Sequence, residues 1–280
     1  MKKQLLKPIT ALGMITCMMI PTQLTGYGAL TYETENSVCY VTENKYYNEV
    51  STMAETISES LPEAEREYMY DACMVSVFGV NYRKSAGQYF ADLICVMTSD
   101  EVNSMQQGLL SNLVYSGSVR YNDDRWEIRA VNPIALNAEG VNEDNYQGLK
   151  LLYATFLEAK EKLTDLDEAA KIRALHDLII EKLDAPAVGV ETTERMHSMT
   201  AALTDHLGAC NVYSSLFYIL GTANGLTVKI DHDHVKHDCN YVFINGKWLS
   251  MDVMYDDTSN STKAYLTEEC IWKSQHKNIS

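Results

Sequence analysis

The sequence predicts an α+β fold, in which a helix that begins at a cysteine packs against an antiparallel sheet. Apolar residues recur at three- and four-residue spacing after Cys210, as they do in an amphipathic helix. Two strand-like runs, residues 240–244 and 247–253, flank Asn245-Gly246, which is a strong signal for a two-residue hairpin. A smaller, mostly helical region is expected to precede this core.

The chain has 280 residues and 46% hydrophobic content, enough for one or two domains with a real core. We expect a secretory signal at residues 1–28, an N-terminal α/β region of unknown role at 29–134 and the core domain at 135–280. The signal depends on three early lysines followed by an apolar run, residues 9–20, that is too short to span a bilayer comfortably. The mature protein is therefore predicted to be secreted, extracellular or on the cell surface, without stable membrane insertion.

The charge balance excludes one class of partner. Residues 1–28 hold three lysines and no acidic residue, so the predicted mature chain carries 20 basic and 38 acidic residues, a net charge of −18. Such a chain repels the phosphates of nucleic acid and anionic membrane surfaces. We therefore expect no nucleic-acid partner.

The region before the core contains signals for two helices and a pair of strands. Capping-box spacing predicts one helix after Ser60, which Gly79 ends, and a second helix after Thr98. Two short strands are expected on either side of a turn at residues 122–124.

Two further helices are expected ahead of the cysteine. The first carries an apolar stripe made of Leu149, Leu152, Tyr153, Phe156 and Leu163. The second is expected to be capped by Asp165 with Glu168, and its core face consists of Ile172, Leu175, Ile179 and Leu183. His176 lies on this second helix and is expected to be structural. Residues 184–194 contain Pro186 and Gly189, which predicts a loop that borders a cleft.

The order Cys210, His237, Asp252 can build a nucleophile, its base and the group that orients the base. Cys210 follows Gly208-Ala209, which breaks the preceding segment, so it is predicted at or just before a helix N-terminus. Unpaired amides and the helix dipole favour a thiolate there.

The hairpin predicts how His237 and Asp252 lie. In a two-residue hairpin Ile244 faces Lys247, which places Asp252 opposite Cys239. Side chains alternate along a strand, so His237 shares the face of Cys239. His237 and Asp252 are therefore expected to be diagonal neighbours on one face, with backbones about 7–8 Å apart.

Three stretches, GACNVYS, HDCNYV and GKWLSMDVMYDD, resemble the core of the transglutaminase-like superfamily, whose fold is papain-like. Bacterial members of that superfamily commonly read G-x-C-x-x-Y-A, H-x-W-N-x-V and G-K-W-x-x-V-D-x-T-W-D-D. The resemblance covers roughly the C-terminal half of the chain. It implies that Cys210 is the nucleophile, His237 the base and Asp252 the third member of a triad.

The resemblance also implies a reaction. Acyl-enzyme chemistry on an amide of a protein or peptide would give peptidase or deamidase activity with water, or cross-linking with an amine. No cofactor is required, and no acidic loop has calcium-site spacing. The chain departs from the family at Cys239 (for Trp), at Met254-Tyr255 (for Thr-Trp) and at Asn211-Val212 (for Gln-Gly), which bears on the substrate.

Two other functions remain open. The run His232, His234 and His237 places three imidazoles close together, as in some zinc hydrolases, although a strand rather than a helix follows it here. A secreted binding module with an inactive core is the other alternative, and the reactivity of Cys210 discriminates it from an enzyme. Six cysteines remain after residues 1–28, and if Cys210 is a free thiol the other five cannot all form disulfides.

Overall fold

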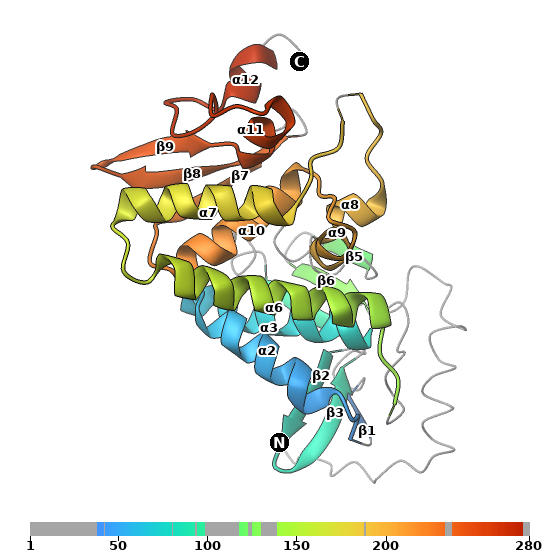
Figure 1. Ribbon diagram of the computed structural model, residues 1–280. Helices are drawn as coiled ribbons and strands as arrows, with labels where there is room; N and C mark the ends of the chain where they lie inside the picture. Colours follow the sequence, from blue (N-terminus) through green and yellow to red (C-terminus); the bar gives the residue numbers. More distant parts are fainter. Residues whose placement is uncertain are drawn as a thin grey trace.

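The fold is described from a computed structural model of the chain. The structure describes residues 38–41, 43–79, 81–92, 94–98, 118–122, 125–129, 139–187, 189–232 and 237–276. Within them the protein is an α+β structure with small antiparallel sheets and many helices (Figure 1). None of the described helices combines the length and the apolar character needed to cross a bilayer.

The C-terminal half is built on an antiparallel sheet of order β7-β8-β9. Its strands are β7 (Val228–His232), β8 (Asp238–Ile244) and β9 (Lys247–Met251). Helix α10 (Cys210–Ala223) packs against β7 and β8, and α7 (Glu168–Lys182) packs beside α10 (Figure 1). The predicted packing of the cysteine helix on an antiparallel sheet is confirmed.

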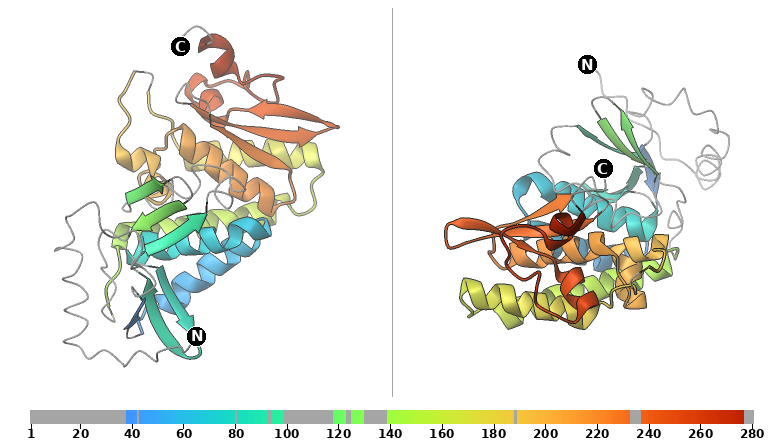
Figure 2. Two further views of the ribbon diagram at one scale, coloured as in Figure 1. Left: turned by 180° about the vertical axis from the view of Figure 1, so that it is seen from behind. Right: turned by 90° about the horizontal axis from the view of Figure 1, so that it is seen from above.

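A second helical layer lies on the far side of α10 and α7 from the sheet (Figure 2). It contains α6 (Glu143–Leu163), with the short helices α8 (Glu194–His197) and α9 (Met199–Asp205) beside it. Helices α2 (Tyr47–Glu59) and α3 (Glu63–Phe78) pack on α6. One continuous cluster of buried apolar side chains joins α2 and α3 to α6, α7 and α10.

Two small sheets belong to the N-terminal part of the chain. The first has the order β1-β3-β2, with β1 at Val38–Val41, β2 at Asn81–Ser85 and β3 at Gln88–Asp92. The second has the order β4-β6-β5, with β4 at Ile94–Thr98, β5 at Ser118–Asn122 and β6 at Arg125–Arg129. The strand pair predicted around residues 122–124 is confirmed as β5 and β6, in which Asn122 faces Arg125.

The predicted hairpin register is confirmed. Asn245 and Gly246 both have positive φ, 52° and 78°, as a type I′ turn requires, and Ile244 faces Lys247 in the ladder. The second strand is shorter than expected, because β9 ends at Met251. Asp252 follows it and begins α11 (Val253–Ser259) as its N-cap.

Two predicted helix caps are wrong. Helix α3 begins after Pro62, and the Ser60 hydroxyl donates instead to the Ile57 carbonyl at the end of α2, a helix that the sequence did not predict. Helix α7 is capped by Asp167, which accepts from Ala170 N at 2.9 Å, and not by Asp165. Gly79 ends α3 as predicted, with a φ of 69°.

Predicted apolar stripes on α6 and α7 are largely confirmed. Every predicted core residue of α7 is buried, as are Leu149, Leu152, Phe156 and Leu163 of α6, and Tyr153 is partly buried against the core. The helix predicted after Thr98 lies outside the described residues, and Thr98 itself ends β4.

Candidate active site

Helix α10 holds Cys210 at its first position, so the predicted location at a helix N-terminus is confirmed. The preceding residue, Ala209, is extended, and its backbone N–H donates to the Met196 carbonyl at 2.8 Å. The amides of a first helical turn lack intrahelical acceptors, and together with the helix dipole they favour an anion. The Cys210 sulfur therefore lies where negative charge is stabilised.

His237 lies directly before β8 and is buried. Its Nε2 is 2.7 Å from Asp252 Oδ2, so the structure brings together the pair that the hairpin register predicted. The imidazole also hydrogen-bonds the Cys210 side chain, and because Nε2 faces Asp252, Nδ1 is the nitrogen left for the sulfur. Trp272 of α12 (Ile271–His276) covers the ring, with the two ring centroids 4.9 Å apart.

These contacts determine the charge state of the imidazole. Burial opposes protonation of His237, but the hydrogen bonds to Asp252 and Cys210 outweigh it and raise the pKa of His237 to about 10. At neutral pH the favoured state therefore contains an imidazolium beside the thiol. An imidazolium next to a cysteine stabilises the thiolate form of that cysteine by charge attraction.

Asp252 has two partners because it lies at the junction of β9 and α11. Its Oδ1 accepts from Tyr255 N at 3.0 Å, which caps α11, and its Oδ2 faces His237. The cap fixes the carboxylate in space, since the side chain cannot rotate without losing the helix amide. Asp252 is therefore held in the orientation that the imidazole needs.

A cavity of about 460 Å³ opens beside the cysteine. Cys210, His237 and the loop after α7 all line it, the last as predicted for residues 184–194. Its described lining contains neither an acidic residue nor a lysine or arginine; it consists of Pro186, Ala187, Gly189, Val190, Thr192, His197, Ala209, Cys210, His237, Met254, Tyr255, Thr258, Ser259 and Trp272. The cavity is therefore suited to an uncharged, largely apolar group.

His197, which no sequence pattern singled out, fixes the cavity loop to the cysteine helix. His197 Nδ1 is 2.8 Å from Asn211 Oδ1, and Asn211 Nδ2 donates to the His197 carbonyl at 2.9 Å. Because the amide nitrogen of Asn211 is used in that second bond, Asn211 Oδ1 is the acceptor and Nδ1 of His197 carries a proton. His197 Nε2 is 2.9 Å from Thr192 Oγ1 on the loop. In the sequence, the one indication of this contact is the position of Asn211 directly after Cys210.

A second set of contacts fixes the start of the same loop. Ala185 N donates to Asp257 Oδ2 at 2.9 Å, and the Tyr213 hydroxyl contacts the same oxygen. The loop is therefore tied to both α10 and α11, the two helices that hold Cys210 and Asp252. Asn240 joins the sheet to α10, because its Nδ2 donates to the Ser214 carbonyl at 2.9 Å.

Two buried thiols lie behind Asp252. Cys270 Sγ is 4.0 Å from Asp252 Oδ2, and Cys239 hydrogen-bonds Cys270. That hydrogen bond and burial raise the pKa of Cys239 well above its usual range. Cys210, by contrast, is partly exposed, whereas Cys73, like these two cysteines, is buried. Of these four thiols, Cys210 is the accessible one.

The run His232, His234 and His237 can be placed only in part. His232 ends β7 and pairs with Asp238 in the ladder, and His234 lies outside the described residues. The group of possible metal ligands that the described residues do bring together is a different one: His237, Asp252 and Cys270.

Comparison with known proteins yields little. No protein-family model matches the chain, and no curated protein matches it in sequence. One solved structure that matches is that of a candidate cysteine protease from Cytophaga hutchinsonii, with 13% sequence identity and a TM-score of 0.29. The match covers 64% of this chain and 70% of the other.

Proposed function

We propose that the protein is a thiol enzyme that acts on amide bonds through an acyl-enzyme, with Cys210 as nucleophile, His237 as acid and base, and Asp252 as the group that orients the imidazole. One observation carries this proposal. Cys210 and Asp252 contact the same imidazole at the wall of a cavity of about 460 Å³, and the sulfur lies at a helix N-terminus. This is the arrangement that nucleophilic catalysis by cysteine needs.

In the first half-reaction the Cys210 thiolate attacks the amide carbonyl carbon. A C–S bond forms while the carbonyl π electrons move to oxygen, and the resulting oxyanion is stabilised at the N-terminus of α10, where the Cys210 amide points. When the intermediate collapses, the C–N bond breaks and His237 Nδ1–H gives its proton to the leaving amine. An acyl-enzyme and a neutral imidazole remain.

In the second half-reaction the neutral imidazole removes a proton from the incoming nucleophile. Water attacks the acyl carbon and releases a carboxylic acid, or an amine attacks and yields a new amide. Either way the C–S bond breaks, and the thiolate and imidazolium are regenerated. Throughout the cycle Asp252 holds Nε2 and stabilises the positive form of the ring.

The finer assignment is a papain-like core of transglutaminase-like type, in a secreted or cell-surface protein that acts on a protein or peptide. Support for it comes from the three sequence motifs and from the N-terminal lysines and apolar run. Apart from the Cys210–His237 pair, the described lining of the cavity contains no acidic residue, lysine or arginine, which favours an acyl donor whose reacting side chain is neutral and largely apolar.

The test is site-resolved alkylation of the purified protein with iodoacetamide between about pH 5 and pH 9, read by mass spectrometry of peptides. We expect Cys210 to be alkylated faster than every other thiol at pH 6.5, and His237→Ala to slow that reaction by about tenfold or more. His206→Asn is the matched control, because His206 is exposed on the αL cap of α9, away from the cavity, and asparagine tolerates that backbone.

An ordinary thiol rate for Cys210, unchanged by His237→Ala, would reject the enzyme and leave a binding module as the function. If Cys210 reacts as expected, peptides with neutral and with charged side chains at the scissile amide are compared next. A preference for charged side chains would contradict the role assigned to the cavity.

A further inference from the structure

Three metal-binding side chains meet behind the Cys210 site. Single donor atoms of His237, Asp252 and Cys270 all lie within 4.8 Å of one another, and all three residues are buried. Imidazole nitrogen, carboxylate oxygen and thiolate sulfur are the three donor types that zinc takes in proteins. Cys270 has no part in the proposed reaction, so the triad does not explain its place here.

The spacing is close to what a tetrahedral ion needs. His237 Nε2 and Asp252 Oδ2 are 2.7 Å apart, and Cys270 Sγ is 4.0 Å from the same oxygen. Ligand atoms of a tetrahedral zinc ion are about 3.3–3.6 Å apart, given bond lengths of about 2.0–2.3 Å. The nitrogen and oxygen would therefore separate, and the sulfur approach, each by about half an ångström.

A fourth donor contacts one member of the group, Cys270. Cys239 hydrogen-bonds Cys270, and the Ser250 hydroxyl lies 4.0 Å from the Cys239 sulfur. The ladder of β8 and β9 ends at Asn240 facing Met251, so Cys239 and Asp252 are the next residues of the two neighbouring chain segments. With it the set becomes two thiolates, one imidazole and one carboxylate, a complete zinc shell.

We propose that Zn²⁺, or another thiophilic divalent cation, binds to His237, Asp252, Cys270 and Cys239. Binding releases the thiol protons of both cysteines and the Nε2 proton of His237 to solvent. Access is from the cavity, whose wall includes His237 and its cover Trp272.

The consequence for catalysis rests on the proposed function. An imidazole that is bonded to the cation through Nε2 cannot form the imidazolium, and its Nδ1 can no longer both give and take a proton. Asp252 is likewise removed from Nε2. The cation-bound protein is therefore an inactive form, in which the sulfur of Cys210 remains free of the metal.

The experiment uses the reduced, metal-free protein and Zn²⁺ alone, titrated against a chromophoric chelator, with Co²⁺ as a spectroscopic substitute. We expect one tight site per chain and a sulfur-to-cobalt charge-transfer band. Cys270→Ala and Cys270→Ser should weaken binding by about tenfold to a hundredfold or more, and bound Zn²⁺ should protect Cys239 and Cys270 of the wild type from alkylation under mild denaturation.

Three controls are matched to the alternatives. Cys210→Ala should bind Zn²⁺ as the wild type does, because the nucleophile is not a ligand. Cys73→Ala should also bind normally, since Cys73 is an equally buried cysteine in α3. His232→Gln combined with His234→Gln should leave affinity unchanged, because neither histidine is among the four proposed ligands.

Absence of tight binding overturns the proposal. Zn²⁺ binding that survives loss of Cys270 but disappears in Cys210→Ala also overturns it, because the cation would then lie between nucleophile and base. Binding that disappears in the double histidine variant overturns it as well. The protection assay needs no variant, so a misfolded Cys270 variant leaves the proposal falsifiable. Binding is measured without substrate; a protein that binds Zn²⁺ in this pattern but has an unreactive Cys210 would refute the proposed function and leave this site standing.

Discussion

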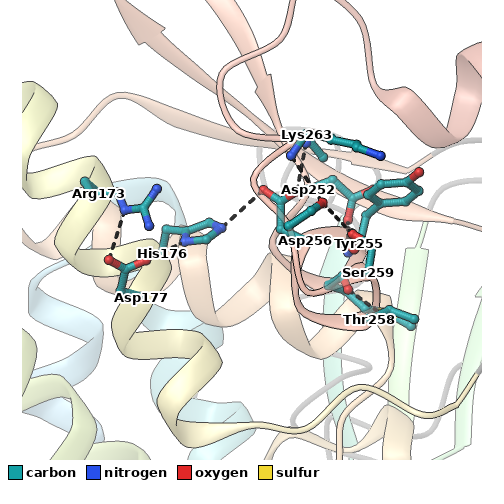
Figure 3. Close-up of polar contacts among 12 residues, drawn as sticks. Arg173, His176, Asp177, Asp252, Tyr255, Asp256, Thr258, Ser259 and Lys263 are labelled. Carbon is teal, nitrogen blue, oxygen red and sulfur yellow. Dashed lines mark hydrogen bonds and ion pairs between the residues drawn. The ribbon is translucent and has the colours of Figure 1, made fainter.

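Two buried histidines contact α11, and comparing them shows what distinguishes a reactive imidazole from a structural one. His237 faces Asp252 at the N-cap of α11. His176 faces Asp256 one turn later, and its Nε2 is 3.3 Å from Asp256 Oδ2 (Figure 3). Both are nearly inaccessible, and each has a carboxylate on Nε2. The carboxylate partner therefore does not separate them.

The two histidines differ in the partner of the other ring nitrogen, Nδ1. His176 Nδ1 is 2.8 Å from Asp177 Oδ1, so the ring lies between two carboxylates and joins α7 to α11 (Figure 3). Burial raises the pKa of Asp177, yet the hydrogen bonds from His176 and Arg173 outweigh it and bring that pKa below its usual value. His237 instead has a thiol at the edge of a cavity on this side. A buried imidazole becomes a candidate base when one nitrogen is held and the other faces a reactive atom.

The largest expected effect comes from Asp252→Asn. Asparagine caps a helix as well as aspartate does, so α11 itself should be retained, whereas loss of the buried His237–Asp252 ion pair lowers the free energy of unfolding. The imidazole loses its anionic partner, and we expect the rate of Cys210 acylation by an activated ester to fall by about 10²-fold or more at pH 7. Stopped-flow kinetics and urea unfolding measure the two quantities. A large stability loss with an unchanged rate would make Asp252 a structural cap alone.

The second prediction concerns pH. The folded-state pKa of His237 is raised to about 10, above its unfolded value of 6.5, so its contribution to stability is complete below pH 6.5 and is lost as the pH rises through 10. Each pKa unit corresponds to about 1.4 kcal/mol. The difference in unfolding free energy between wild type and His237→Gln should therefore shrink across this window, as chemical denaturation at several pH values would measure.

Several groups face His237 and contribute to the raw pH dependence: Asp252, Cys210 and the nearby Cys270. Taking the difference between wild type and variant removes the titrations that do not depend on the imidazole. A difference that is constant between pH 6.5 and pH 10 would show that His237 is neutral in the folded protein.

The third prediction concerns the structural histidine. Asp256→Ala removes the acceptor for Ala264 N, at 2.8 Å, as well as the partner of His176, and both groups are buried. Each buried group left without its partner costs about 1–3 kcal/mol of unfolding free energy. Asp177→Ala is the matched control, because it removes the other carboxylate that contacts His176. It should lower the unfolding free energy by less, since the Asp177 side chain is 52% exposed. Rapid alkylation of Cys210 should survive in both folded variants.

The comparison also shows how far the sequence predicts the site. Asn245-Gly246 allows the positive φ values of its turn, so the register, and with it the approach of His237 to Asp252, follows from local chemistry. The break at Gly208-Ala209 likewise predicts the start of α10 at Cys210. The sequence predicts these features because each depends on residues that are close in the chain.

What the sequence did not predict depends on contacts between distant elements. His176 and Asp256 are separated by 80 positions, and no periodic pattern indicates that α7 meets α11. Cys270, directly before α12, approaches Asp252 through packing of the same kind, because the two residues are 18 positions apart in the chain. The wrong cap at Asp165 has a local cause, because Asp167, two residues later, is an equally good cap and the chain itself does not rank the two.

The smallest expected effect concerns Trp272 of α12. Trp272 covers the His237 ring at 4.9 Å with an interplanar angle of 33°, so its π-face contributes attraction to the imidazolium. Such a contact contributes about 0.5–1 kcal/mol, which corresponds to roughly half a pKa unit. Trp272→Leu should therefore lower the pKa of His237 by about that amount in an NMR titration of its ring proton, and His176 in the same spectra serves as the internal reference. A shift of several units would mean that Trp272 excludes water from the His237–Asp252 pair, in which case the C-terminal helix and the β8–β9 hairpin share the task of holding the imidazole charged.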